Sequence, residues 1–211
     1  MLLSGGIDSA TCLYAVRKNY EVRALTFKYH GIAAREVWSA KAVARAAGVF
    51  EHRFVRLPDL KEAGEISGGR FAGYPPTYIP MRNSIFYSFA ASYAEEVGAD
   101  VVLGGHNKDD GRVFRDVSSG FFAELQRAFW AGSKVMEARK TRLLRPLANK
   151  TKAEVVELAA KAGVPLELTW SCHRDGRDHC WECEGCVGRM DSFRRAGLLD
   201  PLGRSRVTKI T

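Results

Sequence analysis

Short apolar runs alternate with longer amphipathic segments along most of the chain. The short runs are rich in Val, Leu, Ile and Phe, as buried strands are. The longer segments repeat apolar residues every three or four positions, as helices with one buried face do. This pattern predicts strands at residues 1–3, 21–28, 52–57, 100–103 and 142–145. It predicts helices at residues 8–19, 34–47, 83–97, 121–129, 151–163 and 187–196.

Strands that alternate with helices favour an α/β fold, here a parallel five-stranded sheet with helices on both faces, as in Rossmann-like proteins. Ligands of such folds bind beyond the carboxyl ends of the strands. We therefore expect residues 4–9, 30–31 and 104–110 to surround one crevice. The first strand is so short that we also expect the natural start to lie upstream of Met1.

Two stretches depart from the alternation. Residues 64–80 are rich in Gly and Pro, and a loop of this length is typical of a functional loop or lid. Residues 104–120 are irregular. Helix ends are easier to predict: Thr151 and Glu154 match a capping box, and Gly48 is expected to end the helix at 34–47.

The chain has 211 residues and a hydrophobic content of 46%, which suits one domain, or one domain with a small appendage. No stretch approaches the ~18 apolar residues of a membrane span. Because no signal peptide or lipidation motif is visible, we expect a cytoplasmic protein without a membrane partner. The net charge of +8 favours anionic partners such as nucleotides. The basic residues are spread along the chain, which does not favour direct nucleic-acid binding.

Four of the five cysteines lie close together near the C-terminus, with Cys-x7-Cys-x2-Cys-x2-Cys spacing: Cys172, Cys180, Cys183 and Cys186. Four thiolates suit one tetrahedral zinc ion, and a site closed by four sulfurs is structural rather than catalytic. An iron–sulfur cluster and, less favoured, disulfides are the alternatives. We expect His173 and His179 to be solvated loop residues and Cys12 to be a small core residue.

A glycine turn, Ser-Gly-Gly-Ile-Asp-Ser, follows the first strand at residues 4–9. Gly5 and Gly6 allow close backbone approach and positive φ, and N–H groups at the start of the next helix would face an anion. Ser4 and Ser9 add hydroxyl groups, while Asp8 either caps the helix or helps to hold magnesium beside phosphates. No Gly-Lys-Ser/Thr is present, so the turn is not a P-loop of the kinase type.

This turn resembles the PP-loop of ATP pyrophosphatases, which split ATP to AMP and pyrophosphate and activate an oxygen by adenylation. Further strings, together with the cysteines, are similar to the 7-cyano-7-deazaguanine synthase (QueC/ExsB) family. They are PTYIPMRNSIF at residues 76–86, PLANKTKAE at residues 146–154, LELTWSC at residues 166–172 and AGLLDP at residues 196–201.

The resemblance implies a PP-loop ATP pyrophosphatase domain at residues 1–165 and a zinc-binding helical segment at residues 166–211 packed on it. It also implies a carbon–nitrogen ligase that uses ATP with magnesium and ammonia. The family converts 7-carboxy-7-deazaguanine, through an adenylated carboxylate and an amide, to the 7-cyano compound of queuosine and archaeosine biosynthesis. A homodimer is one candidate for the oligomeric state.

We expect Asp8, Arg82 and His106 to be catalytic, with the Arg82 fork on a phosphate or carboxylate and His106 as a base toward ammonium. Lys150 and Lys152 are weaker phosphate candidates than the rest of the nucleotide-binding set. That set comprises Ser4, Gly5, Gly6, Asp8, Ser9, Arg82 and Lys152.

The match weakens in two places. Where the family has Tyr-Gly-Gln followed by basic residues, this chain has YHGIAAR at residues 29–35. Where the family has a stretch that binds the deazaguanine, this chain has GHNKDDGRVFRD at residues 105–116. Either the second stretch is a polar turn or it binds the purine. In the latter case Asp109 and Asp110 would accept from a guanine-like edge, Phe114 would stack on its face, and Asn107 would contact it.

Three other functions stay open. One is a tRNA-thiolating PP-loop enzyme whose cysteines hold an iron–sulfur cluster. Another is a divergent QueC-like enzyme that acts on a macromolecule. The third is a zinc-ribbon nucleic-acid-binding module without catalysis, which the intact glycine turn disfavours.

Overall fold

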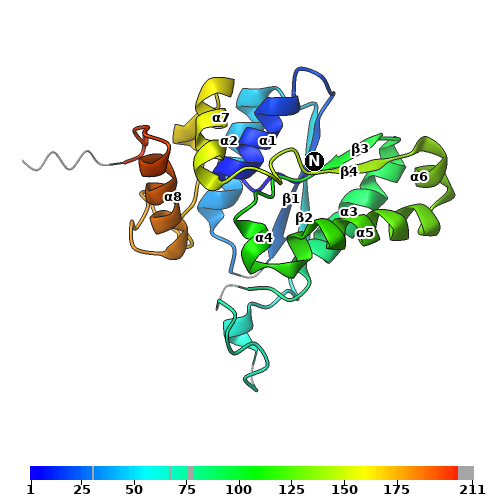
Figure 1. The fold of residues 1–211 in the computed structure, drawn as a ribbon, viewed down its shortest axis with the longest axis horizontal. Coiled ribbons are helices and arrows are strands. Elements are labelled where there is room, and N and C mark those ends of the chain that lie inside the picture. Colours follow the sequence, from blue (N-terminus) through cyan, green and yellow to red (C-terminus); the bar gives the residue numbers. More distant parts are fainter. Residues whose placement is uncertain (30, 67, 76–77, 204–211) are drawn as a thin grey trace, which may run out of the picture.

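Two pairs of parallel strands lie at the centre of the computed structural model, which describes residues 1–203 except 30, 67, 76 and 77. In one pair β1 (Arg23–Tyr29) lies beside β2 (Glu51–Leu57). In the other, β3 (Val101–Leu103) lies beside β4 (Arg142–Leu144). The two pairs appear at the centre of Figure 1.

The predicted five-stranded sheet is wrong in its continuity, because the described strands form two sheets of two strands each. Residues 1–3 lie between the two sheets without forming a named strand. The Leu3 N–H donates to the Leu25 carbonyl at 2.9 Å, and the Leu2 N–H donates to the Leu103 carbonyl at 2.9 Å. A segment this short cannot build a ladder of its own, but it links the two pairs through its backbone.

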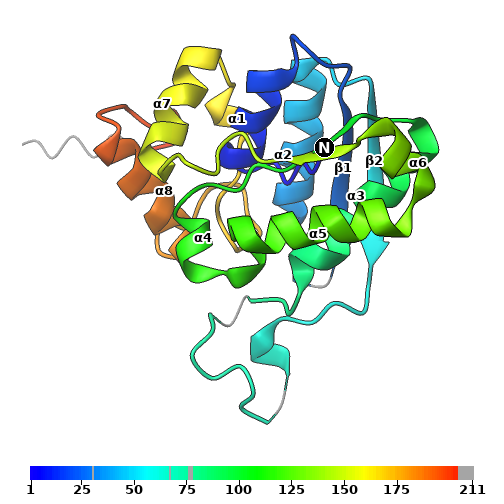
Figure 2. The same cartoon turned by 45° about the vertical axis from the view of Figure 1, so that its right-hand side comes forward.

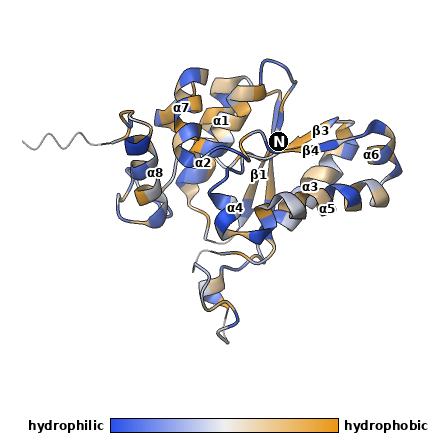
Figure 3. Ribbon diagram, viewed as in Figure 1, coloured by the Kyte–Doolittle hydropathy of each residue, from blue (hydrophilic) through white to orange (hydrophobic). Residues whose placement is uncertain are grey.

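Helices cover both faces of this layer, as predicted (Figures 1 and 2). One apolar cluster joins the strands to α1 (Ile7–Val16), α2 (Ala34–Ala47) and α7 (Lys152–Ala162). The other joins them to α3 (Arg82–Val97) and α5 (Ser119–Gly132). In Figure 3 hydrophobic residues run along β3 and β4, whereas the helices mix hydrophobic and hydrophilic residues. The chain is therefore a mixed α/β protein with a core on each side of its strands.

Three short or displaced helices differ from the predictions. α4 (Asp110–Val113) lies in the stretch that was expected to be irregular, and α6 (Lys134–Arg139) was not predicted. α8 (Glu184–Arg195) begins earlier than expected, because Cys183 is its N-cap. Cys186 therefore belongs to the first turn of a helix, and the metal segment and α8 are continuous.

The predicted helix ends are confirmed at both positions. Thr151 Oγ1 accepts from the Glu154 N–H at 3.3 Å, and Glu154 Oε2 accepts from the Thr151 N–H at 2.7 Å. Gly48 ends α2 with a φ of 69°. Within the described residues, no helix is long and apolar enough to cross a membrane.

A buried ion pair ties α8 to the chain on either side of it. The Arg189 guanidinium donates to both carboxylate oxygens of Asp200 at 2.6 and 2.8 Å, and to Thr169 Oγ1 at 2.8 Å. The Arg189 and Asp200 side chains are 0% and 8% exposed. The pair therefore fixes α8 against the segment that leads into the cysteines.

Replacing Arg189 by leucine should lower the free energy of unfolding by about 3–5 kcal/mol, because it leaves the Asp200 carboxylate buried and unpaired. Urea unfolding monitored by circular dichroism measures this loss. Arg194→Leu is the matched control: its guanidinium pairs with Asp191 but its side chain is 80% exposed, so the change should stay below about 1 kcal/mol. Equal losses in the two variants would contradict this account of α8.

Candidate active site and metal centre

The glycine turn at residues 4–9, hereafter the PP-loop, passes so close to α2 that one position must be glycine. Gly5 has a φ of 89°, and a Cβ there would lie 2.5 Å from the Ala40 nitrogen and 2.7 Å from the Glu36 carbonyl oxygen. Gly6 has an ordinary φ of −76° and caps α1. Only Gly5 therefore uses the left-handed region that both glycines allow.

The first turn of α1 offers free N–H groups to the space in front of it. The first intrahelical bond runs from the Ala10 N–H to the Gly6 carbonyl at 3.1 Å, so the N–H groups of residues 7–9 precede the helical ladder. Ser4 and Ser9 place their hydroxyl oxygens 3.1 Å apart beside this end. Because the helix dipole also favours negative charge here, the geometry suits a phosphate.

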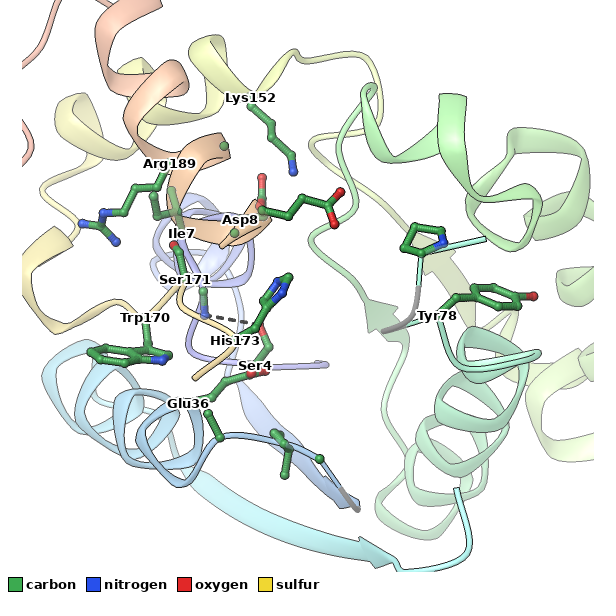
Figure 4. Close-up of a pocket in the computed structure, with 18 of the residues that line it drawn as sticks. Ser4, Ile7, Asp8, Glu36, Tyr78, Lys152, Trp170, Ser171, His173 and Arg189 are labelled. Atoms are coloured by element: carbon green, nitrogen blue, oxygen red, sulfur yellow. Dashed lines mark hydrogen bonds between the residues drawn. The ribbon is translucent and has the colours of Figure 1, made fainter. Parts of the chain in front are cut away.

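This helix end opens into a cavity of about 430 Å³, the main cavity (Figure 4). Figure 4 shows Asp8 at the start of α1, with Lys152 facing it from α7 and Tyr78 reaching in from the side opposite Trp170. Six of the predicted site residues line the main cavity: Ser4, Gly6, Asp8, Arg82, Phe114 and Lys152.

A second cavity of about 270 Å³, the side cavity, lies next to the main cavity. Ser9, His106 and Asp110 line only this one of the two. Apolar side chains of β1 and α3, including Phe27 and Phe86, form much of its wall. Six residues line both cavities and so form the wall between them: Ser4, Asp8, Tyr29, Ile32, Glu36 and Arg82.

Asp8 is not the helix cap, since Gly6 occupies that position, and its carboxylate faces the cavities instead. Asp8 Oδ1 accepts a hydrogen bond from Asn107 Nδ2 at 2.9 Å. Burial, and then the charge of Asp110, raise the pKa of Asp8 to about 6, while Lys152 and Asn107 act in the opposite direction. Asp8 is thus a carboxylate that a nearby cation would stabilise in its charged form.

Asn107 and Asp109 lie in the wall behind Asp8 and line neither cavity. Asn107 is 3% exposed, and its Oδ1 accepts from the Asp109 and Asp110 N–H groups at 2.8 and 3.0 Å. Asp109 Oδ2 accepts from the Lys152 N–H at 2.9 Å. These polar atoms hold Asp8 and the start of α7 in place, because internal bonds already occupy them.

His106 packs against the rings of Tyr87 and Phe122, at centroid distances of 5.8 and 5.7 Å. Burial lowers its pKa to about 4, so the imidazole is neutral at pH 7. Its Nε2 is buried and has no hydrogen-bond partner among the described residues. The neutral ring can therefore accept a hydrogen bond from a ligand in the side cavity.

Glu36 and Tyr29 were not predicted as site residues, although both line the two cavities. Burial raises the pKa of Glu36 to about 7, and the charge of Arg82 opposes that rise. In the sequence Glu36 looks like any acid in a first helical turn. Its position follows from the packing of α2 against Gly5, which the sequence pattern does not reveal.

Two aromatic rings of the main cavity face each other. Tyr78 comes from the predicted functional loop at residues 64–80, and Phe114 follows α4. Their planes are 5° from parallel and their centroids lie 6.0 Å apart. His30, which was expected at this crevice, and residues 76 and 77 of the PTYIPMRNSIF string lie outside the described residues.

The four clustered cysteines place their sulfur atoms within 4.8 Å of one another. The Sγ atoms of Cys180 and Cys186 are 3.8 Å apart, as are those of Cys172 and Cys183. A tetrahedron with metal–sulfur bonds of about 2.3 Å has edges of about 3.8 Å, so the spacing fits a four-coordinate ion. The Cys183 N–H donates to Cys180 Sγ at 3.3 Å, which favours a thiolate there.

The segment that leads into the cysteines also supports the PP-loop. The Trp170 N–H donates to the Gly5 carbonyl at 3.0 Å, and Ser171 and His173 line the main cavity. The expectation of a solvated His179 is wrong. His179 is 5% exposed, packs on Trp170 with ring centroids 4.2 Å apart, and accepts from the Ser171 N–H at 3.0 Å.

Comparison with known proteins places this site in a family. The family model described as "Queuosine biosynthesis protein QueC" matches residues 1–197. Proteins named 7-cyano-7-deazaguanine synthase from Thermoplasma acidophilum and Acetivibrio thermocellus are 35% and 36% identical, covering 96% of this chain and 90% and 95% of theirs. The corresponding protein of Nostoc punctiforme is 34% identical over 96% of this chain and 98% of its own.

Similarity to a solved structure bears on the fold alone. The NMN synthetase from Francisella tularensis superposes with a TM-score of 0.50 and 19% identity, over 94% of this chain and 76% of that chain. The sequence matches, by contrast, are nearly complete and well above 30% identity. The chain belongs to the QueC family.

Proposed function

We propose that this protein is an ATP-dependent 7-cyano-7-deazaguanine synthase, a carbon–nitrogen ligase that converts 7-carboxy-7-deazaguanine and ammonia to the 7-cyano compound. One observation carries the proposal. In a chain that matches the QueC family from residue 1 to 197, the free helix end of the PP-loop opens into a cavity that Asp8, Arg82 and Lys152 also line. The family match favours this activity over tRNA thiolation.

In the first activation, the phosphates of ATP lie at the N-terminus of α1, where N–H groups and Lys152 offset their charge. Asp8, with Asp110 nearby, would hold the magnesium ion that accompanies ATP and that neutralises charge on the leaving pyrophosphate. A carboxylate oxygen of the substrate attacks the α-phosphorus, pyrophosphate leaves, and an acyl adenylate forms. Arg82 orients the carboxylate.

Ammonia then attacks the acyl carbon, the bond from that carbon to the AMP oxygen breaks, and the nitrogen loses a proton. His106 is neutral and lines the neighbouring cavity, where its Nε2 can accept a hydrogen bond from the ammonia and orient it for attack. The proton then passes to solvent. The amide oxygen then attacks the α-phosphorus of a second ATP and pyrophosphate leaves. Cleavage of the carbon–oxygen bond releases AMP, and loss of the nitrogen's protons leaves the nitrile. Each nitrile therefore consumes one ammonia and two ATP.

We assign zinc to the four cysteines. Four sulfurs leave no open coordination position, so the ion supplies structure rather than catalysis. Its proposed role is to hold Trp170, Ser171 and His173 against the PP-loop.

Product analysis tests this function. Zinc-loaded protein with ATP, magnesium, 7-carboxy-7-deazaguanine and ¹⁵N-ammonium should form a nitrile that carries one ¹⁵N and should release two AMP per nitrile. Omitting the deazaguanine should reduce pyrophosphate release to background. Absence of substrate-dependent pyrophosphate release would refute the proposal, and a sulfur-containing tRNA product would support the thiolation enzyme instead.

A further inference from the structure

Glu36, Arg82 and Tyr29 meet in the wall between the two cavities. They come from α2, α3 and the end of β1, and each lines both cavities. The backbone of Glu36 is fixed beside the PP-loop, because its carbonyl oxygen lies 2.7 Å from where a Gly5 Cβ would be. Figure 4 shows Glu36 on the far side of the main cavity from Lys152. The Glu36 backbone is therefore fixed beside the PP-loop, and Glu36 lines both cavities from there.

The Glu36 carboxylate differs from its neighbours in having unused hydrogen-bonding capacity. Asp8 accepts from Asn107, and Asp109 and Asp110 accept from backbone N–H groups. Among the described residues the Glu36 carboxylate accepts no hydrogen bond, and the charge of Arg82 alone opposes the effect of burial on its pKa. A largely enclosed carboxylate without donors is costly, and a ligand that brings two donors would offset that cost.

The proposed substrate presents a matching edge. Going round its pyrimidine ring from the carboxylate, the groups are the ring carbonyl, the N1–H and the 2-amino group. The carboxylate and the ring carbonyl are acceptors, and the N1–H and the 2-amino group are donors. Arg82 carries only donors, and an ionised Glu36 carries only acceptors. Along the substrate edge two acceptors are followed by two donors. The Arg82–Glu36 pair offers donors and then acceptors, so the pair and the edge are complementary.

On the basis of the proposed function, we propose that Glu36 is the specificity residue for the guanine-like base: its carboxylate accepts from N1–H and the 2-amino group, while Arg82 spans the ring carbonyl and the carboxylate to be activated. The adenine of ATP fits this pair less well, because its edge places one donor beside one acceptor. Glu36 thus takes over the recognition that the sequence assigned to Asp109 and Asp110.

The test compares 7-carboxy-7-deazaguanine with the analogue that lacks only its 2-amino group. A site built to bind a donor rejects such an analogue strongly, so the wild-type protein should prefer the parent compound by about 10²-fold or more in kcat/KM. Glu36→Gln should lose at least about 10-fold of this preference, because the carboxamide offers one acceptor instead of two. The KM for ATP should change by less than about 2-fold, since the variant leaves the PP-loop intact.

Glu62→Gln is the matched control. Glu62 also lines the main cavity, but its side chain forms a capping box with Glu65 at the start of a short 3-10 helix. It should keep the wild-type preference. An unchanged preference in Glu36→Gln, or a rise in the KM for ATP without loss of preference, overturns the inference. If Glu36→Gln does not fold, Glu36→Asp takes its place. A wild-type preference for the parent compound in that variant would also overturn the inference. Failure of the wild-type protein with the parent compound would instead refute the proposed function.

Discussion

Asp8→Asn is expected to reduce substrate-dependent pyrophosphate release by at least about 10³-fold, because the variant loses the carboxylate that faces the phosphate-binding end of α1. Asparagine keeps the size of the side chain and can still contact Asn107. It cannot neutralise a magnesium ion beside the leaving pyrophosphate. Pyrophosphate release under saturating ATP, deazaguanine and ammonium measures the loss.

The same substitution should not weaken the fold, which separates a catalytic role from a structural one. Burial raises the pKa of Asp8 to about 6, above its value in an unfolded chain. Its charged form therefore destabilises the folded state at pH 8, and this cost disappears below about pH 4, where both states are protonated. Asp8→Asn should melt at the same or a higher temperature at pH 8.

Asp59→Asn is the control and should keep full activity, because Asp59 is exposed and lines neither cavity. Retained activity in Asp8→Asn, or a clear fall of its melting temperature at pH 8, would contradict the role assigned to Asp8.

Cys183→Ser is expected to release the metal and to lower the free energy of unfolding by about 3 kcal/mol or more, since binding energy at a structural site is folding energy. In a chain of this size the melting temperature should fall by about 10 °C. The KM for ATP should also rise, because Trp170 no longer holds the Gly5 carbonyl of the PP-loop in place. Metal content, calorimetry and steady-state kinetics measure the three effects.

Cys12→Ala is the matched control, because Cys12 is the one cysteine outside the cluster. It is buried and bonds weakly to the Gly104 carbonyl, so its loss should cost some stability without loss of metal. A Cys183→Ser protein that keeps one zinc per chain, or that loses zinc with unchanged ATP kinetics, would contradict the link between the metal segment and the PP-loop.

Local sequence patterns predicted the ends of an element well where residues of that same element fix them. The Thr151 capping box needs only residues of its own helix, and it is present as expected. The continuity of the sheet could not be predicted in this way, because residues 1–3 bond to two separate strands without forming one. The helix α6 was missed because six residues are too few to show a helical period.

The candidate site divides in the same way. The PP-loop string and the cysteine spacing mark their own positions, and the structure brings Asp8, Arg82 and Lys152 to one cavity. Glu36 and the buried acceptor His179 depend on tertiary packing, and no local signal separates them from ordinary polar residues. Conversely, Asp109 looked free in the sequence but is held by the start of α7.

The fate of the substrate oxygens tests the account most directly. With both carboxylate oxygens of 7-carboxy-7-deazaguanine labelled with ¹⁸O, adenylation of the acid and then of the amide should place one labelled oxygen in each of two AMP molecules and none in the nitrile. Mass spectrometry of AMP, pyrophosphate and the nitrile reads this out in a single reaction. Unlabelled AMP, or ¹⁸O in pyrophosphate or inorganic phosphate, would contradict activation of the carboxylate at the PP-loop.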